Sequence, residues 1–386
     1  MGICARIAVT VIVVLLIGRI AFAASDVYTI NVVLPMTGPG AAVGADLTTA
    51  LRLYETQVNA TGGIRGTQLH FDIHDDQTSP QVAVQETNVV LQQHPAVILG
   101  SGMAAQCQAM AALVSGGPVQ YCFSSAVNPA RGYVFAAGPT NDLTGPVMLK
   151  YFHDKGYRRL AIISTTDASG QIFLASTLAA VAAYNNPDMT VVANERFNVS
   201  DLSVAAQLSR IGASNAQVVL VLVSGTPFGT VLRGMHDAGM ELPVFASPAN
   251  MNRAQLASYA GFLPTSLTFL GSAYQARDQE PKLRRATTAF YDAFKRANLT
   301  PTPLNADAWD PASIVVGALR ALGPAATAEQ LRDYIGNLHD VTGIFGDYDF
   351  RKNQHGISDQ RAVVIVRWDQ RRNDWIADSQ PGGAPL

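Results

Sequence analysis

The sequence predicts an α/β protein of two lobes, each built on a parallel sheet covered by helices. Short apolar segments alternate with helix-length amphipathic segments along most of the chain, an order typical of parallel strands joined by crossover helices. Residues 218–223 are apolar without interruption, as expected of a strand that is buried on both faces. The chain has 386 residues, more than the roughly 250–300 at which a single core stops growing, so two lobes are expected.

The first strand and helix are predicted by the spacing of their apolar residues. Alternation over residues 28–34 predicts a strand, and Leu47, Leu51 and Tyr54 recur at the spacing of one helix face. Later strands are predicted at residues 68–74, 96–99, 118–122, 160–163, 191–195, 218–223, 244–246 and 267–270. A second helix is predicted from Ser79 onward, because Ser followed by Pro is typical of a helix start. The last third should contain helices at 282–298, 306–322 and 328–338, followed by strands at 344–350 and 362–368.

The composition excludes two classes of protein. Hydrophobic residues make up 48% of the chain and charged residues only 15%, which excludes a mainly disordered protein. Lys and Arg together number 27 against 29 Asp and Glu, giving a formal charge of −2, and the sequence has no basic run. Because nucleic-acid binding requires clustered basic residues, we expect no nucleic-acid partner.

Residues 1–23 have the pattern of a secretory signal peptide. Arg6 supplies the basic start, and residues 7–17 form an apolar run that is shorter than the roughly 20 residues of a membrane-spanning helix. Ala21 and Ala23 are small enough for a signal peptidase, so we expect cleavage after Ala23 and export to the periplasm. An uncleaved anchor is the alternative, because Arg19 interrupts the approach to the cleavage site.

Two cysteines follow this leader, Cys107 and Cys122. Exported proteins fold in an oxidising compartment, in which a pair of cysteines is commonly joined. We therefore expect a disulfide between Cys107 and Cys122. Two thiols alone do not make a structural zinc site.

Two further segments suggest enzymatic or metal chemistry that the rest of the sequence does not support. Residues 100–105 match a Gly-x-Gly-x-x-Ala dinucleotide pattern, but no acidic residue follows at the distance that the ribose requires, so we expect an anion-tolerant helix N-terminus. His70, Asp72 and His74 resemble a metal cluster, but they alternate with apolar residues like the exposed face of a strand. Neither a nucleophile elbow nor a phosphate-binding loop motif occurs. We expect neither an enzyme nor a resident cofactor or metal.

Several short motifs follow one another in an order that resembles one known family. They are Pro-Met-Thr-Gly-Pro at 35–39, Gly44, Val-Asn-Ala-Thr-Gly-Gly-Ile-Arg-Gly at 58–66, Asp75-Asp76, the loop at Gly100, Arg131-Gly132-Tyr133 and Phe-Gly-Asp-Tyr-Asp-Phe at 345–350. In this combination the chain resembles the periplasmic solute-binding proteins of the leucine/isoleucine/valine type, which are receptors for ATP-driven (ABC) importers. The resemblance covers essentially the whole chain after the leader.

The resemblance implies two Rossmann-like lobes joined by three hinge crossings, which we expect near Ala137, Ser272 and Phe350. Lobe 1 would comprise residues 24–137 and 273–350, and lobe 2 residues 138–272 and 351–386. The ligand would bind in the interlobe cleft and be held by hinge closure, with no bond made or broken. The resemblance further implies a monomer that delivers a small molecule to the membrane permease of an ABC importer.

The resemblance also implies which positions contact the ligand. In lobe 1 they are Val43, Met103, Ala104, Ser124, Ser125 and Val127, and in lobe 2 they are Ser169, Ser224, Thr226, Ala249 and Asn250. Val43 and Ser169 stand where the family commonly has aromatic residues, and they would leave more room. Asn250, Ser224 and Thr226 are available for a hydroxyl or keto oxygen.

Ala249 decides which ligand we expect, because amino-acid binders of the family have an acidic residue at this position. Burying an ammonium without a carboxylate partner is costly. We therefore expect a small carboxylate with an aromatic or branched apolar body, its anionic end held at the helix N-terminus near Ala104. A branched-chain amino acid is the alternative ligand, and a periplasmic sensor module is a further, less favoured function.

Overall fold

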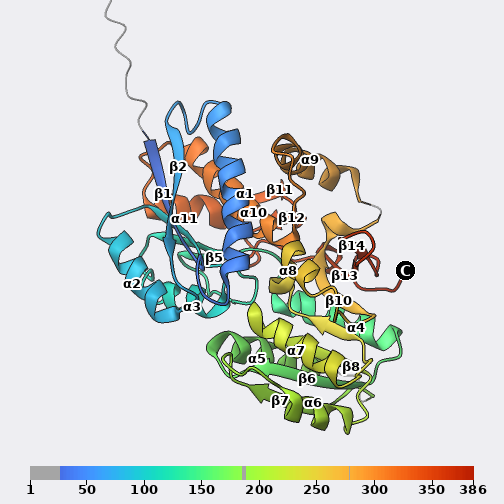
Figure 1. Cartoon of the computed structure of the whole chain (residues 1–386). Helices are drawn as coiled ribbons and strands as arrows, with labels where there is room; N and C mark the ends of the chain where they lie inside the picture. Colours follow the sequence, from blue (N-terminus) through green and yellow to red (C-terminus); the bar gives the residue numbers. More distant parts are fainter. Residues whose placement is uncertain (1–26, 185–187, 278) are drawn as a thin grey trace, which may run out of the picture.

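The computed structural model describes residues 27–184, 188–277 and 279–386, and the expected leader, residues 1–23, lies outside them. The chain forms two lobes, each a sheet with helices packed against it, in the upper and lower parts of Figure 1. This architecture confirms the predicted α/β class. Within the described residues, no helix is both long enough and apolar enough to cross a bilayer.

The first lobe contains a five-stranded parallel sheet in the order β2-β1-β3-β4-β5. Its strands are β1 Val27–Leu34, β2 Gln68–Asp75, β3 Val97–Gly100, β4 Val119–Cys122 and β5 Val134–Ala136. The helices among them are α1 Ala41–Ala60, α2 Pro80–Leu91 and α3 Ala104–Ala111. Helix α2 begins as predicted, since the Ser79 hydroxyl accepts a hydrogen bond from the Val82 N–H at 3.4 Å.

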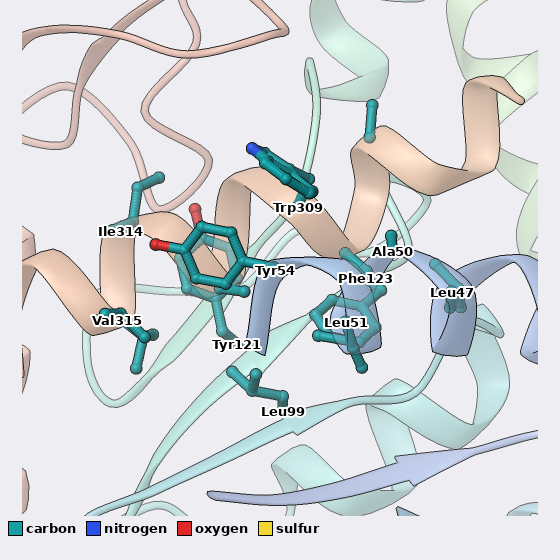
Figure 2. Packing of buried hydrophobic residues seen from close by; sticks show 14 of the residues in the cluster. Leu47, Ala50, Leu51, Tyr54, Leu99, Tyr121, Phe123, Trp309, Ile314 and Val315 are labelled. Carbon is teal, nitrogen blue, oxygen red and sulfur yellow. The ribbon is translucent and has the colours of Figure 1, made fainter. Parts of the chain in front are cut away.

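The chain returns to this lobe after residue 280. The returning elements are α9 Pro281–Arg296, α10 Pro303–Leu322, α11 Ala328–Asn337 and a two-stranded sheet of β11 His339–Thr342 and β12 Asp347–Asp349. Figure 2 shows where α10 meets α1 in the core. Leu47, Leu51 and Tyr54 of α1 are buried, which confirms the predicted helix face, and the Tyr54 ring lies 5.0 Å from the Trp309 ring of α10, centroid to centroid. Apolar packing between α1 and α10 therefore joins the two parts of the lobe.

The second lobe contains a seven-stranded sheet in the order β14-β13-β10-β9-β8-β6-β7. Its strands are β6 Arg159–Thr165, β7 Thr190–Phe197, β8 Val218–Leu222, β9 Val244–Ala246, β10 Leu267–Ser272, β13 Val363–Asp369 and β14 Asp374–Ala377. Its helices are α4 Asn141–Asp154, α5 Ala168–Ala183, α6 Ala205–Gly212, α7 Thr226–Asp237 and α8 Arg253–Ser258. The strands from β6 to β10 pair in parallel, whereas β13 and β14 pair antiparallel at one edge.

Several element boundaries differ from the predicted ones by a few residues, and two of these differences have a clear structural reason. Helix α10 begins at Pro303 rather than at residue 306, because proline is well suited to the first helical position, where its missing N–H needs no acceptor. The strand predicted over 344–350 is reduced to β12, because the carboxylate of Asp310 accepts hydrogen bonds from the Ile344 and Phe345 N–H groups. The short strands β5, β11 and β14 were not predicted.

The three crossings between lobes remain a prediction, but the contacts around the third one are informative. Ile357 and Ala362 are buried in the core of the first lobe, beyond the expected crossing at Phe350. The Gln354 side-chain amide donates to the Val134 carbonyl of β5 at 2.8 Å. The chain joins the second sheet at Val363. These contacts favour a third crossing close to Val363.

Candidate functional site

A cleft between the two lobes encloses about 1310 Å3 of empty space, its open mouth included. The loops after β3 and β4 form its wall on the first lobe, and the loops after β8 and β9 form its wall on the second. Helices α4 and α5, the first turn of α10 and the end of β10 also line it. The carboxyl ends of parallel strands therefore converge on the cleft, which is where open α/β sheets bind small molecules.

The cleft brings together most of the residues that the sequence analysis assigned to the site. Those that line it are Met103, Ala104, Ser124 and Ser125 from the first lobe and Ser169, Ser224 and Ala249 from the second. Apolar side chains make up much of the remaining wall, namely Phe123, Met148, Phe173, Leu222, Phe245, Met251, Leu270, Leu304 and Phe345. The Ser224 hydroxyl is buried and has no hydrogen-bond partner within the described residues.

Four expected site residues lie outside this lining. Val43 is buried against Gly102. Thr226 is exposed at the start of α7. Val127 is buried, and its carbonyl lies 2.8 Å from a ring nitrogen of His355. Asn250 is fully buried, and its amide donates to the Val223 carbonyl at 2.8 Å and accepts from the Gly225 N–H at 3.1 Å. Asn250 therefore fixes the loop that carries Ser224, and its polar atoms are already used there.

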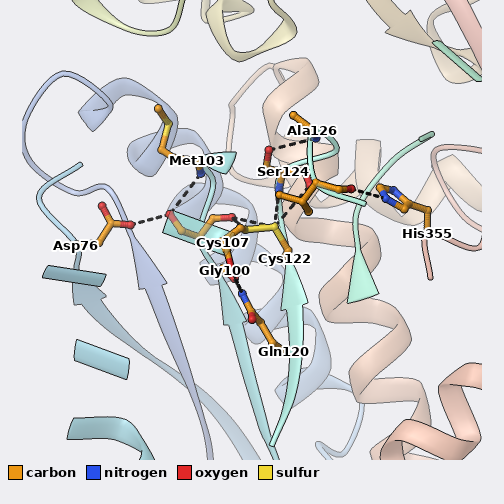
Figure 3. Close-up of a disulfide and its surroundings, with 11 residues drawn as sticks. Asp76, Gly100, Met103, Cys107, Gln120, Cys122, Ser124, Ala126 and His355 are labelled. Atoms are coloured by element: carbon orange, nitrogen blue, oxygen red, sulfur yellow. Dashed lines mark hydrogen bonds between the residues drawn. A yellow bond between two sulfur atoms is a disulfide. The ribbon is translucent and has the colours of Figure 1, made fainter. Parts of the chain in front are cut away.

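The loop that presents Met103 and Ala104 is held from two sides (Figure 3). The predicted disulfide is confirmed, since Cys107 of α3 is bonded to Cys122 at the end of β4, with 5.8 Å between their Cα atoms. On the other side, the Ser101 hydroxyl donates to the buried Asp76 carboxylate at 2.6 Å and accepts from the Met103 N–H at 3.3 Å. Burial raises the pKa of Asp76 to about 6, although the hydrogen bond from Ser101 opposes this shift.

Two helices present uncapped N-termini at the cleft. Helices α3 and α4 have no side-chain hydrogen bond at their N-caps, which are Met103 and Thr140. Their first N–H groups have no partner within the helix, and the helix dipole adds a partial positive charge there. The cleft can therefore hold an anion without a basic side chain.

Asp307 carries the only formal charge among the described side chains that line the cleft. Its carboxylate has neither a hydrogen bond nor an ion pair to the described residues. Burial raises its pKa well above the usual value, and the nearby charge of Asp310 adds to the effect. The sequence analysis missed Asp307, because it belongs to no motif; the available signal was an acidic residue in the apolar start of α10.

Two α/β lobes that enclose a cleft define a two-lobed ligand-binding protein. The chain belongs to the periplasmic binding protein family, whose model matches residues 27–373. It is 25% identical over 343 residues to the leucine-, isoleucine-, valine-, threonine- and alanine-binding protein of Pseudomonas aeruginosa, a match that covers 85% of this chain and 89% of the relative.

Solved structures show the same fold. An extracellular ligand-binding receptor from Rhodopseudomonas palustris HaA2 matches with a TM-score of 0.79 at 19% identity, covering 90% of this chain and 99% of that one. A solute-binding protein of an ABC transporter from R. palustris, in complex with benzoate, matches with a TM-score of 0.76 at 16% identity, covering 93% and 97%. At these identities the likeness concerns the fold and not the ligand.

Proposed function

We propose that the protein is the periplasmic receptor of an ABC importer and that it binds a small carboxylate with an aromatic or branched apolar body. The observation that carries the proposal is the cleft itself, which combines uncapped helix N-termini with largely apolar walls. The N–H groups near Ala104 suit a carboxylate, and side chains such as Phe173 and Phe245 suit an apolar body.

On the second lobe, Ala249 favours a carboxylate ligand without an ammonium group over an amino acid. It lines the cleft and offers no acceptor side chain for an ammonium. An unpaired ammonium in such a site loses its hydration without compensation. A keto acid or an aromatic acid has no such group to desolvate.

A branched-chain amino acid is the second candidate, and the P. aeruginosa relative, named for binding leucine, isoleucine and valine, favours it. Asp307 is also an acidic group within the cleft. Leucine and its keto acid, 4-methyl-2-oxopentanoate, differ mainly in the ammonium, so this pair separates the two candidates.

Binding would work by hinge closure, after which the closed form would dock on the membrane permease as a monomer. The two lobes touch beside the cleft, where the Asn252 amide of the second lobe donates to the Ala42 carbonyl of α1 at 3.5 Å. A ligand that contacts both lobes favours this arrangement by its differential affinity for the closed form.

Calorimetry on the ligand-free protein tests the proposal with benzoate, 4-methyl-2-oxopentanoate and leucine. We expect the two carboxylates without an ammonium to bind at micromolar concentrations and leucine at least tenfold more weakly. Ala249→Glu should reverse this preference, whereas Thr226→Glu, which adds the same charge outside the cleft lining, should leave it unchanged. Tight binding of leucine to the wild type, with neither acid bound, would replace the proposal with the amino-acid candidate.

A further inference from the structure

Asp307 is an acidic residue in the lining of the cleft, and the fold itself does not require an acidic side chain at this position. Helix α10 presents Pro303, Leu304 and Asp307 to the cleft, positions that share one helix face. Two of these three side chains are apolar. The third is the only formally charged side chain that the described residues contribute to the lining.

A second carboxylate on the same helix shows what a structural role looks like. Asp310 accepts hydrogen bonds from the Ile344 N–H at 3.0 Å, the Phe345 N–H at 3.1 Å and the Tyr348 hydroxyl at 2.8 Å. It thereby fixes the loop between β11 and β12. Asp307 has no such partner among the described residues and holds no segment in place.

Asp307 is half-buried, and a carboxylate that is largely desolvated without a partner destabilises a protein. The Tyr274 hydroxyl, which is close enough to Asp307 for the two groups to interact electrostatically, is buried without a hydrogen-bond partner within the described residues, although Tyr274 does not itself line the cleft. A hydrogen-bond donor on a bound ligand would offset that cost.

The ligand's own carboxylate is poorly suited to this position, because two carboxyl groups pair only when one of them keeps a proton, and no basic side chain lines the cleft within the described residues. The uncapped N-termini of α3 and α4 suit that group better. Asp307 must then face another part of the ligand.

We propose that Asp307 determines specificity by accepting a hydrogen bond from a hydroxyl or amine group on the ligand, away from its carboxylate. The inference rests on the proposed function and narrows the ligand to a carboxylate that also carries a donor group. Hydroxylated or amino-substituted aromatic acids have this chemistry. A purely apolar acid leaves Asp307 unpaired and binds more weakly.

Calorimetry with matched aromatic acids tests this inference on the ligand-free protein. The probes are benzoate and its 3- and 4-hydroxy, 3- and 4-amino and 3- and 4-methoxy derivatives. The methoxy group keeps an oxygen at the position of the hydroxyl and adds a methyl group, and it cannot donate. We expect at least one hydroxy or amino derivative to bind the wild type at least tenfold more tightly than its methoxy counterpart.

Variants at position 307 show whether this preference comes from Asp307. Asp307→Leu should reduce the preference to within threefold, while Asp307→Asn, which keeps an acceptor oxygen, retains part of it. Asp292→Leu removes an exposed carboxylate of α9 in the same lobe and should change nothing. Because Asp307 is unpaired, Asp307→Leu should fold with an unchanged or higher thermal midpoint.

Equal binding of the methoxy and donor-bearing acids, or a preference that persists in Asp307→Leu, overturns the inference and leaves the proposed function standing. If no aromatic or keto acid binds and leucine does, the proposed ligand class fails instead. The role of Asp307 is then tested by the affinity for leucine alone, because the ammonium group of leucine is the hydrogen-bond donor. Leucine must lose at least tenfold in affinity in Asp307→Leu, and an unchanged affinity overturns the inference there too.

Discussion

The side-chain amide of Asn252 donates a hydrogen bond to the carboxylate of Asp46 at 2.9 Å, and this bond joins the two lobes. Asp46 lies on α1 of the first lobe, and Asn252 directly precedes α8 of the second. The same carboxylate accepts from the Thr302 hydroxyl at 2.9 Å. Burial raises the pKa of Asp46, while the hydrogen bonds from Thr302 and Asn252 oppose the shift. The contact is therefore strongest when the carboxylate is ionised.

Asn252→Asp should weaken ligand binding by roughly tenfold to a hundredfold, because it removes a hydrogen bond to a charged group and places two carboxylates together in the closed form. Asn252 also caps α8 by accepting from the Gln255 N–H at 2.8 Å, and aspartate retains that function. Calorimetry measures the affinity, and added salt should recover part of it.

Asn252→Ser is the matched variant, because it keeps a capping oxygen without adding a charge. Its affinity should fall between those of the wild type and Asn252→Asp. If both variants bind ligand as the wild type does, the contact with Asp46 does not distinguish the open form from the closed one.

Gly225→Ala should prevent closure. Gly225 has a φ of 74°, and a Cβ atom there would overlap with the carbonyl oxygen of Pro39 on the other lobe. Gly239→Ala is the control, because its φ of 62° is also in the range that disfavours a side chain but a Cβ atom there meets nothing within 4 Å. We expect both variants to lose thermal stability and only Gly225→Ala to lose ligand affinity, by at least tenfold. Equal affinities of the two variants would contradict this role of Gly225.

The fold and the disulfide could be predicted from the sequence because they depend on local signals. The apolar spacing of Leu47, Leu51 and Tyr54 determines which face of α1 is buried. The two cysteines that follow the expected leader leave one possible intramolecular pair. Such patterns need no knowledge of how distant segments meet.

The site residues were harder to predict because packing decides which side chains reach the cleft. Val43 was expected in the cleft wall, but Gly102 has no side chain, so Val43 and Leu47 pack closely against it and fill that space. Asn250 has the chemistry of a ligand contact, yet it bonds to the backbone of its own lobe. Asp307 reaches the cleft only because the chain returns to the first lobe through α10.

Removing the disulfide should lower the free energy of unfolding by about 3 kcal/mol, the value expected for closing a loop of this length in the unfolded chain. Cys107 and Cys122 are 15 residues apart. Denaturant unfolding of the Cys107→Ala/Cys122→Ala variant measures the loss, and a reductant should produce a similar loss in the wild type. The reductant should leave the double variant unchanged, and an effect on that variant would show that it acts elsewhere.

Asp76 and Asp75 are adjacent carboxylates with pKa shifts of opposite sign. Burial raises the pKa of Asp76 from 3.8 to about 6. Burial acts in the same sense on Asp75, but hydrogen bonds from Thr37, Gln77 and Met36 outweigh it and lower the pKa of Asp75. Because the folded state holds the proton of Asp76 more tightly than the unfolded state does, the stability contributed by Asp76 is fully present below about pH 4 and lost as the pH rises through about 6. For Asp75 the contribution is present above about pH 4 and lost as the pH falls.

Comparing the wild type with Asp76→Asn therefore isolates the pH dependence that Asp76 gives to the free energy of unfolding, and the sign of this dependence is known. The free energy of unfolding of the wild type, minus that of Asp76→Asn, should fall by on the order of 3 kcal/mol between pH 4 and pH 7, because a pKa shift of one unit corresponds to about 1.4 kcal/mol. Denaturant titrations at several pH values measure this difference, in which the other titrating groups cancel. Asp75→Asn should give a difference that is nearly flat over this range and falls as the pH drops below about 4. A flat difference for Asp76→Asn would mean that Asp76 titrates alike in the folded and unfolded states, and that its hydrogen bond from Ser101 compensates fully for its burial.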